Sequence, residues 1–363
     1  MKERNDFLRG FVAAVIPILI VAAVLTGCTS RQLKWSILEW NILNPYAGVD
    51  WTKYQQHKAN FHTHTTMSDG RRTPQEVIDH YHALGYTILA LTDHDTMGPL
   101  KDRDHPERHK TTWPWQLFDR DPEALGMVAI EGNEISRRHH IGSYFIDYGD
   151  ADAESEDVVI KEIGRRGGLA VLLHPGKFKK PVEWYLKMYR AYPHLIGFEI
   201  YNLWDRYPKD RKTWDAILTN IVTERPVWGF SNDDMHSPKT QLGLSWNIML
   251  LPDLSPEWVR RAMENGIFFF VYAPNGHHGP TPAVIKSITV NPQNGTIHID
   301  VTGHERIDWI SKGKIVHRGD HVNLFELQGL GGYIRAEIHA ADGGPIVGTQ
   351  PFRIQPSTMD GGP

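Results

Sequence analysis

The sequence predicts an α/β fold followed by a smaller all-β sandwich, because of the way its apolar segments are spaced. Short apolar segments alternate with helical patterns up to about residue 280, which indicates βαβ units in a mainly parallel sheet or barrel. From residue 281 onward, strand-like segments follow one another without a helix-length pattern. We therefore expect an α/β domain over residues 57–280 and a β-sandwich over residues 281–363, preceded by a leader (1–27) and a tether (28–56).

The expected α/β domain contains clear helix and strand patterns. Thr73 can cap a helix that has Pro74 at its first position and Glu76 in a capping box, and Gly85 ends this helix. Two further helices are expected over residues 156–166 and 256–265. Strands are expected over residues 59–62, 87–92, 127–131, 141–146, 169–173, 197–201, 227–230 and 247–251.

The C-terminal part has the pattern of a small antiparallel β domain. Asn294-Gly295 is typical of a hairpin turn between two strands. The expected strands cover residues 285–290, 296–301, 307–310, 314–316, 323–327, 333–339 and 352–354.

Composition excludes some classes of protein. The chain has 363 residues and a net charge of −4, which argues against stable binding to nucleic acid through a basic surface. Its single cysteine excludes a disulfide framework. With 20 histidines and one cysteine, any metal site has to be built from His, Asp and Glu side chains.

The N-terminal leader resembles that of bacterial lipoproteins. Basic residues precede the apolar run 11–25, and the run ends in Leu25-Thr26-Gly27-Cys28, which is similar to a lipobox. The resemblance implies cleavage before Cys28, its lipidation, and anchoring at the membrane surface in the cell envelope, on the periplasmic or extracellular face. Thr29 in place of Asp favours the outer membrane where one exists. The alternative is a plain membrane-anchoring helix with an incidental cysteine.

One short motif predicts a metal site. His62 and His64 are two apart on an expected strand, so both imidazoles point to one face, and Asp69 follows in a Ser-Asp-Gly turn. Further ligand-type side chains lie at the ends of other expected strands, where parallel α/β folds place their active sites. These side chains are His94, Glu131, His139, His140, His174, Asp234 and His236.

Together these motifs resemble those of the polymerase and histidinol phosphatase (PHP) family of metal-dependent phosphoesterases. The matching motifs are His-x-His with Ser-Asp-Gly, Thr-Asp-His, Glu-x-x-Glu-Ile-Ser, His-Pro-Gly and Asp-x-His, in the family's order over residues 58–240. The resemblance implies a distorted β/α barrel of about seven strands, with two or three divalent ions held by nine ligands.

The resemblance also implies a role for each ligand. His62, His64 and Asp234 match the ligands of the first metal, and Glu131 matches the carboxylate that bridges two metals. His174 matches a ligand of the second metal, together with either His140 or His139; we favour His140. The ligands of the third metal are matched by Asp69, His94 and His236.

Basic side chains close to these ligands are candidates for binding a phosphoryl group. Arg71 follows the Ser-Asp-Gly turn, Arg138 precedes the histidine pair, and Lys177 follows His174-Pro175-Gly176. We expect Asp93 and Asp95 to orient neighbouring groups and not to bind metal directly. For Glu199, a role beside the ligands and a purely structural role stay open. The long insertion 97–121 is either a substrate wall or a surface excursion.

The sequence therefore predicts a membrane-anchored phosphoesterase that hydrolyses phosphomonoesters or phosphodiesters with water activated by Zn, Mn or Fe. We expect its substrate to be a small phosphorylated compound or nucleotide. One alternative is an amidohydrolase-type enzyme that cleaves another bond, although such enzymes commonly use a carboxylated lysine as the bridging ligand. The other alternative is a surface-binding lipoprotein without catalytic activity.

Overall fold

The structure is a computed structural model, and it describes residues 39–95 and 112–357 of the chain. The leader, its lipobox and most of the insertion 97–121 lie outside the described residues. Within the described part, no helix is both long enough and apolar enough to span a membrane. The chain from Glu39 onward forms one compact unit.

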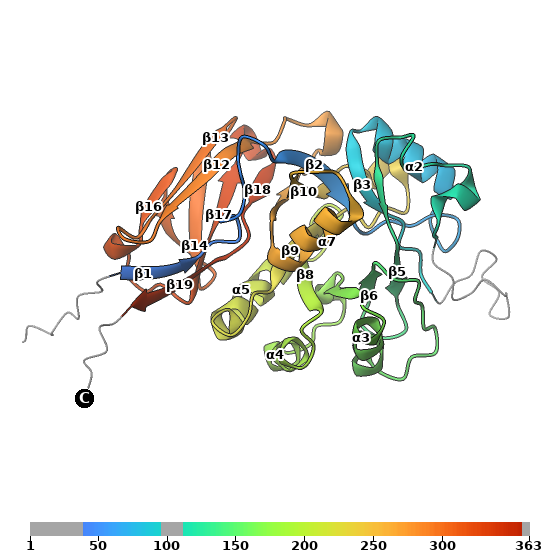
Figure 1. Cartoon of the computed structure of the whole chain (residues 1–363), viewed down its shortest axis with the longest axis horizontal. Helices are drawn as coiled ribbons and strands as arrows, with labels where there is room; N and C mark the ends of the chain where they lie inside the picture. Colours follow the sequence, from blue (N-terminus) through green and yellow to red (C-terminus); the bar gives the residue numbers. More distant parts are fainter. Residues whose placement is uncertain (1–38, 96–111, 358–363) are drawn as a thin grey trace, which may run out of the picture. The chain divides into compact units, whose positions relative to one another are not determined.

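A five-stranded mixed sheet supplies one side of the α/β part (Figure 1). Its first three strands pair in an antiparallel manner, and the last three pair in a parallel manner. The strands, in both chain and sheet order, are β5 (Gly132–Ile135), β6 (Ile141–Tyr144), β7 (Leu169–Leu172), β8 (Leu195–Asn202) and β9 (Trp228–Asn232).

Part of an eleven-stranded sheet supplies the other side. β2 (Gln55–Asn60), β3 (Tyr86–Ala90) and β4 (Val128–Ile130) pair in parallel, whereas β10 (Ser245–Leu251) pairs antiparallel to both β2 and β11 (Phe268–Tyr272).

Two single-residue bridges connect the two sides: Thr63, after β2, pairs with Met235, after β9, and His94, after β3, pairs with Glu134 of β5. The α/β part is therefore mixed, and the seven-stranded barrel stays a prediction.

The helices agree with the capping patterns where those exist. α2 (Pro74–Ala83) has the complete capping box, since the Glu76 amide donates to the Thr73 hydroxyl and the Thr73 amide donates to the Glu76 carboxylate. The expected helices at 156–166 and 256–265 are present, but the sequence analysis did not identify α4 or α5. The remaining helices are α3 (Glu156–Arg165), α4 (Val182–Ala191), α5 (Asp210–Ile221), α6 (Pro238–Gln241) and α7 (Pro256–Asn265), and the short 3-10 turns are η1 (Trp115–Phe118), η2 (Pro175–Lys177), η3 (Gly276–His278), η4 (Leu324–Glu326) and η5 (Ala341–Gly343).

The C-terminal part consists of two antiparallel sheets that share one hydrophobic core, to which Ile288 and Ile299 contribute from one sheet and Trp309 and Ile338 from the other. The prediction of a strand over residues 323–327 was wrong, because η4 occupies most of that segment. The smaller sheet contains β12 (Val284–Asn291), β13 (Thr296–Thr302) and β16 (His321–Asn323). The larger is the remaining part of the eleven-stranded sheet and contains β14 (Arg306–Ser311), β15 (Lys314–Arg318), β17 (Tyr333–His339), β18 (Ile346–Gly348) and β19 (Phe352–Ser357).

Two pairings differ from the expected division of the chain. β1 (Glu39–Leu43) pairs with β19, so these residues belong to the C-terminal sheet and not to a tether. The reason is burial: Trp40 is only 5% exposed and packs in the core, with its ring edge-on to Phe325. β18 pairs with β11, so the eleven-stranded sheet runs on past residue 280.

Candidate metal centre

Nine His, Asp and Glu side chains from separate segments converge at one place in the α/β part. The described residues contain three groups whose ligand atoms all lie within 4.8 Å of one another: His62, His64, Glu134 and Asp234; His64, Asp69, His94 and His236; and His94, Glu134 and His140. His174 completes the cluster, because its Nε2 lies 3.0 Å from Glu134 Oε1.

The innermost group has the spacing of a four-coordinate metal site. His62 Nε2 lies 3.3 Å from Glu134 Oε2 and 3.2 Å from Asp234 Oδ1, and His64 Nε2 lies 3.2 and 3.1 Å from the same two oxygens. Ligand atoms about 2.0 Å from a tetrahedral ion are themselves about 3.3 Å apart. The two nitrogens and two oxygens therefore have nearly the spacing that one ion would impose.

The same four atoms are buried and lack hydrogen-bond partners. His62 Nε2, His64 Nε2, Glu134 Oε2 and Asp234 Oδ1 are all inaccessible to solvent, and none makes a hydrogen bond of acceptable geometry. Leaving one buried polar atom unsatisfied costs about 1–3 kcal/mol. Four such atoms aimed at one point fit a divalent cation, which satisfies all of them at once.

Glu134 is shared between this group and the other histidines. Its Oε2 lies 3.0 Å from His94 Nδ1, and its Oε1 lies 2.6 Å from His140 Nδ1. On the outer side, Asp69 lies 3.2 Å from His236 Nε2 and 3.6 Å from His94 Nε2. A carboxylate between two sets of imidazoles can hold two ions with one side chain.

Local backbone geometry positions the ligands. His174 and Asp234 adopt positive φ angles of 26° and 45°, which non-glycine residues adopt only when the surrounding structure imposes them. Gly70 is required in the turn that carries Asp69, because a Cβ there would lie 2.5 Å from the His64 carbonyl oxygen. The ligand loops are thus built around close backbone approaches.

Neighbouring carboxylates orient the ligands. Glu199 Oε1 lies 3.0 Å from His62 Nδ1, and Glu199 Oε2 accepts the His174 amide at 2.7 Å. A proton on His62 Nδ1 would leave Nε2 as the lone-pair nitrogen that faces the cluster. Asp93 accepts hydrogen bonds from the Thr65 amide and the Ser68 hydroxyl, so it organises the loop.

The charged side chains of the cluster shift the pKa values of their neighbours. Burial by itself would lower the pKa of His64, but the carboxylates of Asp234 and Glu134 raise it to about 10. Burial likewise opposes charge on Glu134, yet the imidazoles of His94, His140 and His62 hold the pKa of this carboxyl well below its usual range. Metal binding would replace imidazole protons and therefore release them.

The prediction that Glu131 is the bridging carboxylate was wrong. Glu134, and not Glu131, lies in the ligand cluster. Glu131 lies between β4 and β5, about half-buried, and burial followed by the charge of Asp147 raises its pKa. Side chains three positions apart on extended chain point to opposite faces, so only one of these two glutamates can face the cluster. The short strand β5 was not predicted, because its central residues are polar. Both glutamates belong to the Glu-x-x-Glu motif, so the motif alone did not distinguish them.

The structure distinguishes the two adjacent histidines. His140 lies in the cluster, as we favoured, whereas His139 lies outside the three groups. The buried ring of His139 stacks on Phe178 at 4.4 Å and lies parallel to Trp184 at 5.6 Å. Its role as a ligand is therefore not supported by its position.

Of the three basic candidates, one reaches the cluster. Lys177 Nζ lies 3.2 Å from His140 Nε2. Arg71 donates its backbone amide to the His236 carbonyl, but its side chain is exposed, as is that of Arg138. Among the described residues, neither arginine side chain forms an ion pair with a cluster carboxylate.

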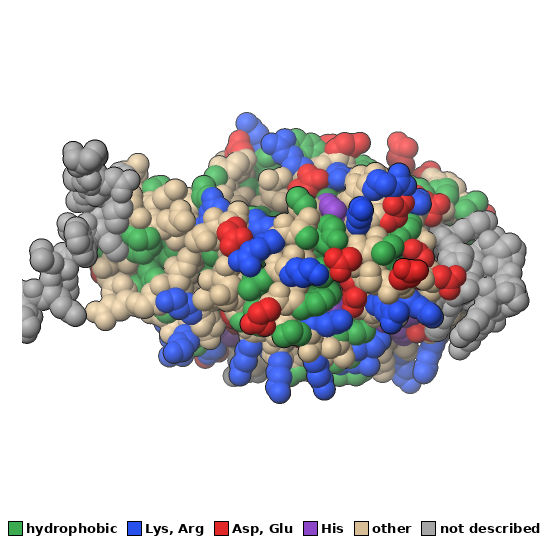
Figure 2. All heavy atoms as spheres, turned by 90° about the horizontal axis from the view of Figure 1, so that it is seen from below, with side chains coloured by type: hydrophobic (Ala, Val, Ile, Leu, Met, Phe, Trp, Pro, Cys, Tyr) green, Lys and Arg blue, Asp and Glu red, His purple; other side chains and the backbone are tan. Residues whose placement is uncertain are grey.

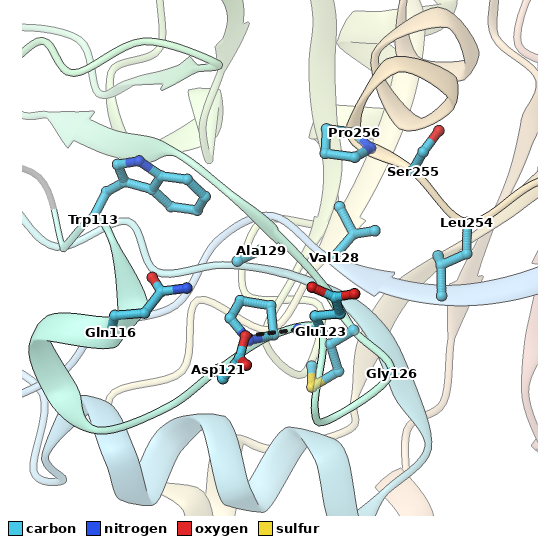
Figure 3. Close-up of a pocket in the computed structure, with 12 residues that line it drawn as sticks. Trp113, Gln116, Asp121, Glu123, Gly126, Val128, Ala129, Leu254, Ser255 and Pro256 are labelled. Carbon is cyan, nitrogen blue, oxygen red and sulfur yellow. Dashed lines mark hydrogen bonds between the residues drawn. The ribbon is translucent and has the colours of Figure 1, made fainter.

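A cavity of about 420 Å³ lies at the other end of β4 and is not the metal centre (Figure 3). It is lined by residues such as Trp113 and Gln116, and by Asp121, whose carboxylate accepts the Glu123 amide. Among the described residues that line this cavity, the charged ones are the carboxylates of Asp121 and Glu123.

No family model matches the chain. The chain is 21% identical over 272 residues to a 5'-3' exoribonuclease of Haemophilus influenzae, a match that covers 55% of this chain and 98% of that protein.

Among solved structures, a two-domain protein from Bacteroides vulgatus ATCC 8482, described as containing a predicted PHP-like metal-dependent phosphoesterase, is similar. Its TM-score is 0.54 at 18% identity, over 83% of this chain and 96% of that one. This similarity shows the fold, a mixed α/β arrangement with many strands and few helices.

Two smaller solved structures match with lower TM-scores. A metal-dependent phosphoesterase described as putative, from Bifidobacterium adolescentis, has a TM-score of 0.38 at 18% identity and covers 58% of this chain and 96% of that chain. An amidohydrolase from Chromobacterium violaceum has a TM-score of 0.37 at 18% identity and covers 57% of this chain and 95% of that chain.

Proposed function

We propose that this protein is a metal-dependent hydrolase of phosphoric ester bonds. The observation that carries the proposal is the set of four buried ligand atoms, on His62, His64, Glu134 and Asp234, that converge without hydrogen-bond partners. The similarity in fold to a PHP-like two-domain protein supports the same class. Zn, Mn and Fe all accept this combination of imidazoles and carboxylates, and the cluster has ligands for two or three ions.

The side chains of the cluster would divide the work between binding and orientation. Divalent cations held here would lower the pKa of a water molecule and neutralise charge on a phosphoryl group. Glu134 would keep the ions close together, and Glu199 would hold His62 in the required tautomer. Lys177, which reaches His140 at the edge of the cluster, would contact a phosphoryl oxygen.

A comparison of bond classes tests this proposal. The purified, metal-analysed protein would be assayed with p-nitrophenyl phosphate, bis-p-nitrophenyl phosphate, a 5'-phosphorylated oligoribonucleotide and a p-nitroanilide. We expect one or more bound divalent ions per chain and turnover of at least one phosphoester that a chelator abolishes. Cleavage of the anilide alone would favour the amidohydrolase alternative. Bound metal with no turnover of any substrate would favour a surface-binding protein.

The oligoribonucleotide belongs in this panel because of the similarity to an exoribonuclease. The net charge of −4 still argues against stable nucleic-acid binding, so we favour a small phosphorylated compound or nucleotide as the substrate.

We also propose that lipidation of Cys28 anchors the chain in the cell envelope, on the periplasmic or extracellular face and in the outer membrane where one exists. The support is the Leu25-Thr26-Gly27-Cys28 motif after an apolar run. Metabolic labelling with a fatty acid tests it: we expect label on the native chain and none on the variant Cys28→Ser. Equal labelling of both chains would contradict the proposal.

A further inference from the structure

A second cavity lies directly beside the metal centre and is lined by basic side chains. Its volume is about 510 Å³, and four cations line it: Lys179, Lys180, Arg206 and Lys209. Figure 2 shows the molecule from below, a face on which many Lys and Arg side chains are exposed among Asp and Glu side chains. In the cavity at the far end of β4, by contrast, the charged side chains among the described lining residues are carboxylates.

Short connections join this cavity to the cluster. Pro175 and Gly176 form part of its wall and immediately follow the ligand His174. Tyr207 also lines it, and the Tyr207 ring centroid lies 6.2 Å from that of His174. Gly176 permits this close approach, because a Cβ at this position would lie 2.7 Å from Tyr207 Cβ. A ligand of moderate size can therefore reach both places.

The charge of the cavity is only partly neutralised. Lys180 pairs with Glu156 at 2.9 Å. Lys179, Arg206 and Lys209 form no ion pair with any carboxylate in the described part of the chain. A surface that keeps three unpaired cations around a concavity attracts an anion.

Two helices add to this positive potential. α4 begins after Pro181 and α5 begins after Lys209, and neither helix has a side chain that caps its first amides. Lys209, just before α5, and Lys180, two residues before α4, line the cavity. Uncapped amides and the helix dipole both favour a negative group at these ends.

One acidic side chain, that of Asp210, also lines the basic cavity, but its carboxylate is buried and hydrogen-bonded. The carboxylate of Asp210 lines the cavity but is only 4% exposed, and it accepts the Gly176 amide at 3.1 Å. Burial raises the pKa of Asp210 to about 7, so near neutral pH its charge is partly removed.

We propose that this cavity is a subsite for a second anionic group of the substrate, separate from the phosphoryl group that is hydrolysed. This inference rests on the proposed function and specifies its substrate class: a phosphoester that carries another phosphate or carboxylate at a distance from the ester bond. Lys179, Arg206 and Lys209 are then specificity-determining residues that contact this distal group. The cluster binds the reacting group, and the cavity selects the compound.

Binding of α,ω-alkanebisphosphonates to the metal-containing protein tests this inference. Each bisphosphonate would be compared by calorimetry with the alkylphosphonate of equal chain length, and a phosphonocarboxylate series would distinguish a distal phosphate from a distal carboxylate. We expect one chain length at which the second anion tightens binding at least about tenfold, the size of a charged hydrogen bond.

Matched variants test whether the cavity side chains cause the gain in affinity from the second anion. The pair Lys179→Gln with Arg206→Gln should abolish the gain from the second anion and leave alkylphosphonate binding within about twofold of the native value. Lys161→Gln with Lys187→Gln removes the same kind of charge from exposed positions on α3 and α4 outside the cavity, and it should keep the gain. No gain at any chain length, or a gain that persists in the cavity variant, would overturn the inference. Because calorimetry needs no turnover, a protein that shows the gain but hydrolyses no phosphoester would contradict the proposed function alone.

Discussion

Replacement of Glu134 by glutamine is the sharpest test of the metal centre. Glutamine keeps the size and shape of the side chain but removes its negative charge and one lone-pair oxygen. Glu134 lies within 3.3 Å of a nitrogen on each of His62, His64, His94, His140 and His174. No other carboxylate in the described part of the chain contacts so many imidazoles, so this single change affects every ion that the cluster could hold.

The expected loss of metal affinity in Glu134→Gln follows from these distances. At 3.3 Å, and with an effective dielectric constant of about 20, one unit of charge on Glu134 is worth about 5 kcal/mol towards a unit positive charge at a neighbouring ligand atom. Loss of a side chain that only orients a metal ligand typically weakens metal binding about 10- to 100-fold. Because Glu134 is itself among the ligand atoms, we expect Glu134→Gln to weaken binding by more than about 100-fold.

Metal content and thermal stability provide the readout. The native protein at a metal concentration about 100 times its Kd should be stabilised by about 2.7 kcal/mol relative to chelator-treated protein, whereas Glu134→Gln should show no such difference. Its phosphoesterase activity should fall below detection. Glu131→Gln is the matched control, since the side chain of Glu131 lies outside the cluster, and it should keep native metal content and activity. Full activity in Glu134→Gln, or an equal loss in both variants, would refute the assignment.

Three further predictions follow from buried charges elsewhere. Glu199→Gln should weaken metal binding about 10- to 100-fold, seen by competition with a chelator, because the partner that holds His62 Nδ1 loses its charge; unchanged affinity would contradict the orienting role. Burial raises the pKa of Asp210 from 3.8 to about 7, so its contribution to stability is present below about pH 4 and is lost as pH rises to about 7, by up to roughly 4 kcal/mol. The free energy of unfolding of Asp210→Asn, measured with urea, should therefore fall less between about pH 5 and about pH 8 than that of the native protein. An equal fall in both proteins would contradict the raised pKa of Asp210. Arg335 is 2% exposed and pairs with Asp215 at 2.8 Å. Arg335→Met should therefore lower the free energy of unfolding by about 3–5 kcal/mol, because it leaves a buried carboxylate unpaired. Adding Asp215→Leu should recover part of the loss, and no recovery would contradict this cause.

The sequence predicted most of the cluster because its ligands lie in short motifs at strand ends. His62 and His64 form one motif on the segment that follows β2, and His94, His174, Asp234 and His236 each lie beside a strand that the apolar pattern indicated. Each of these side chains lies where the structure brings ligand atoms together. The exception was Glu134, because the strand that carries it has no apolar alternation to reveal it.

The basic cavity beside the cluster could not be predicted from the sequence. Lys179, Arg206 and Lys209 come from segments that no motif connects, and surface lysines and arginines are usually only solvated charges. Only the packing of η2 against the start of α5 brings these side chains around one concavity. Their joint position is therefore a property of long-range packing and not of local pattern.

The sequence by itself determined the kind of chemistry, since a chain with one cysteine and many strand-end histidines can hold divalent ions only through imidazoles and carboxylates. It also determined local features such as the capping box at Thr73 and the hairpin at Asn294-Gly295, because these depend on neighbours in the chain. The tertiary structure decided which of two glutamates faces the ligand cluster, that β1 joins the C-terminal sheet, and where the unpaired cations gather. Those outcomes depend on contacts between residues far apart in the chain, and local spacing does not encode such contacts.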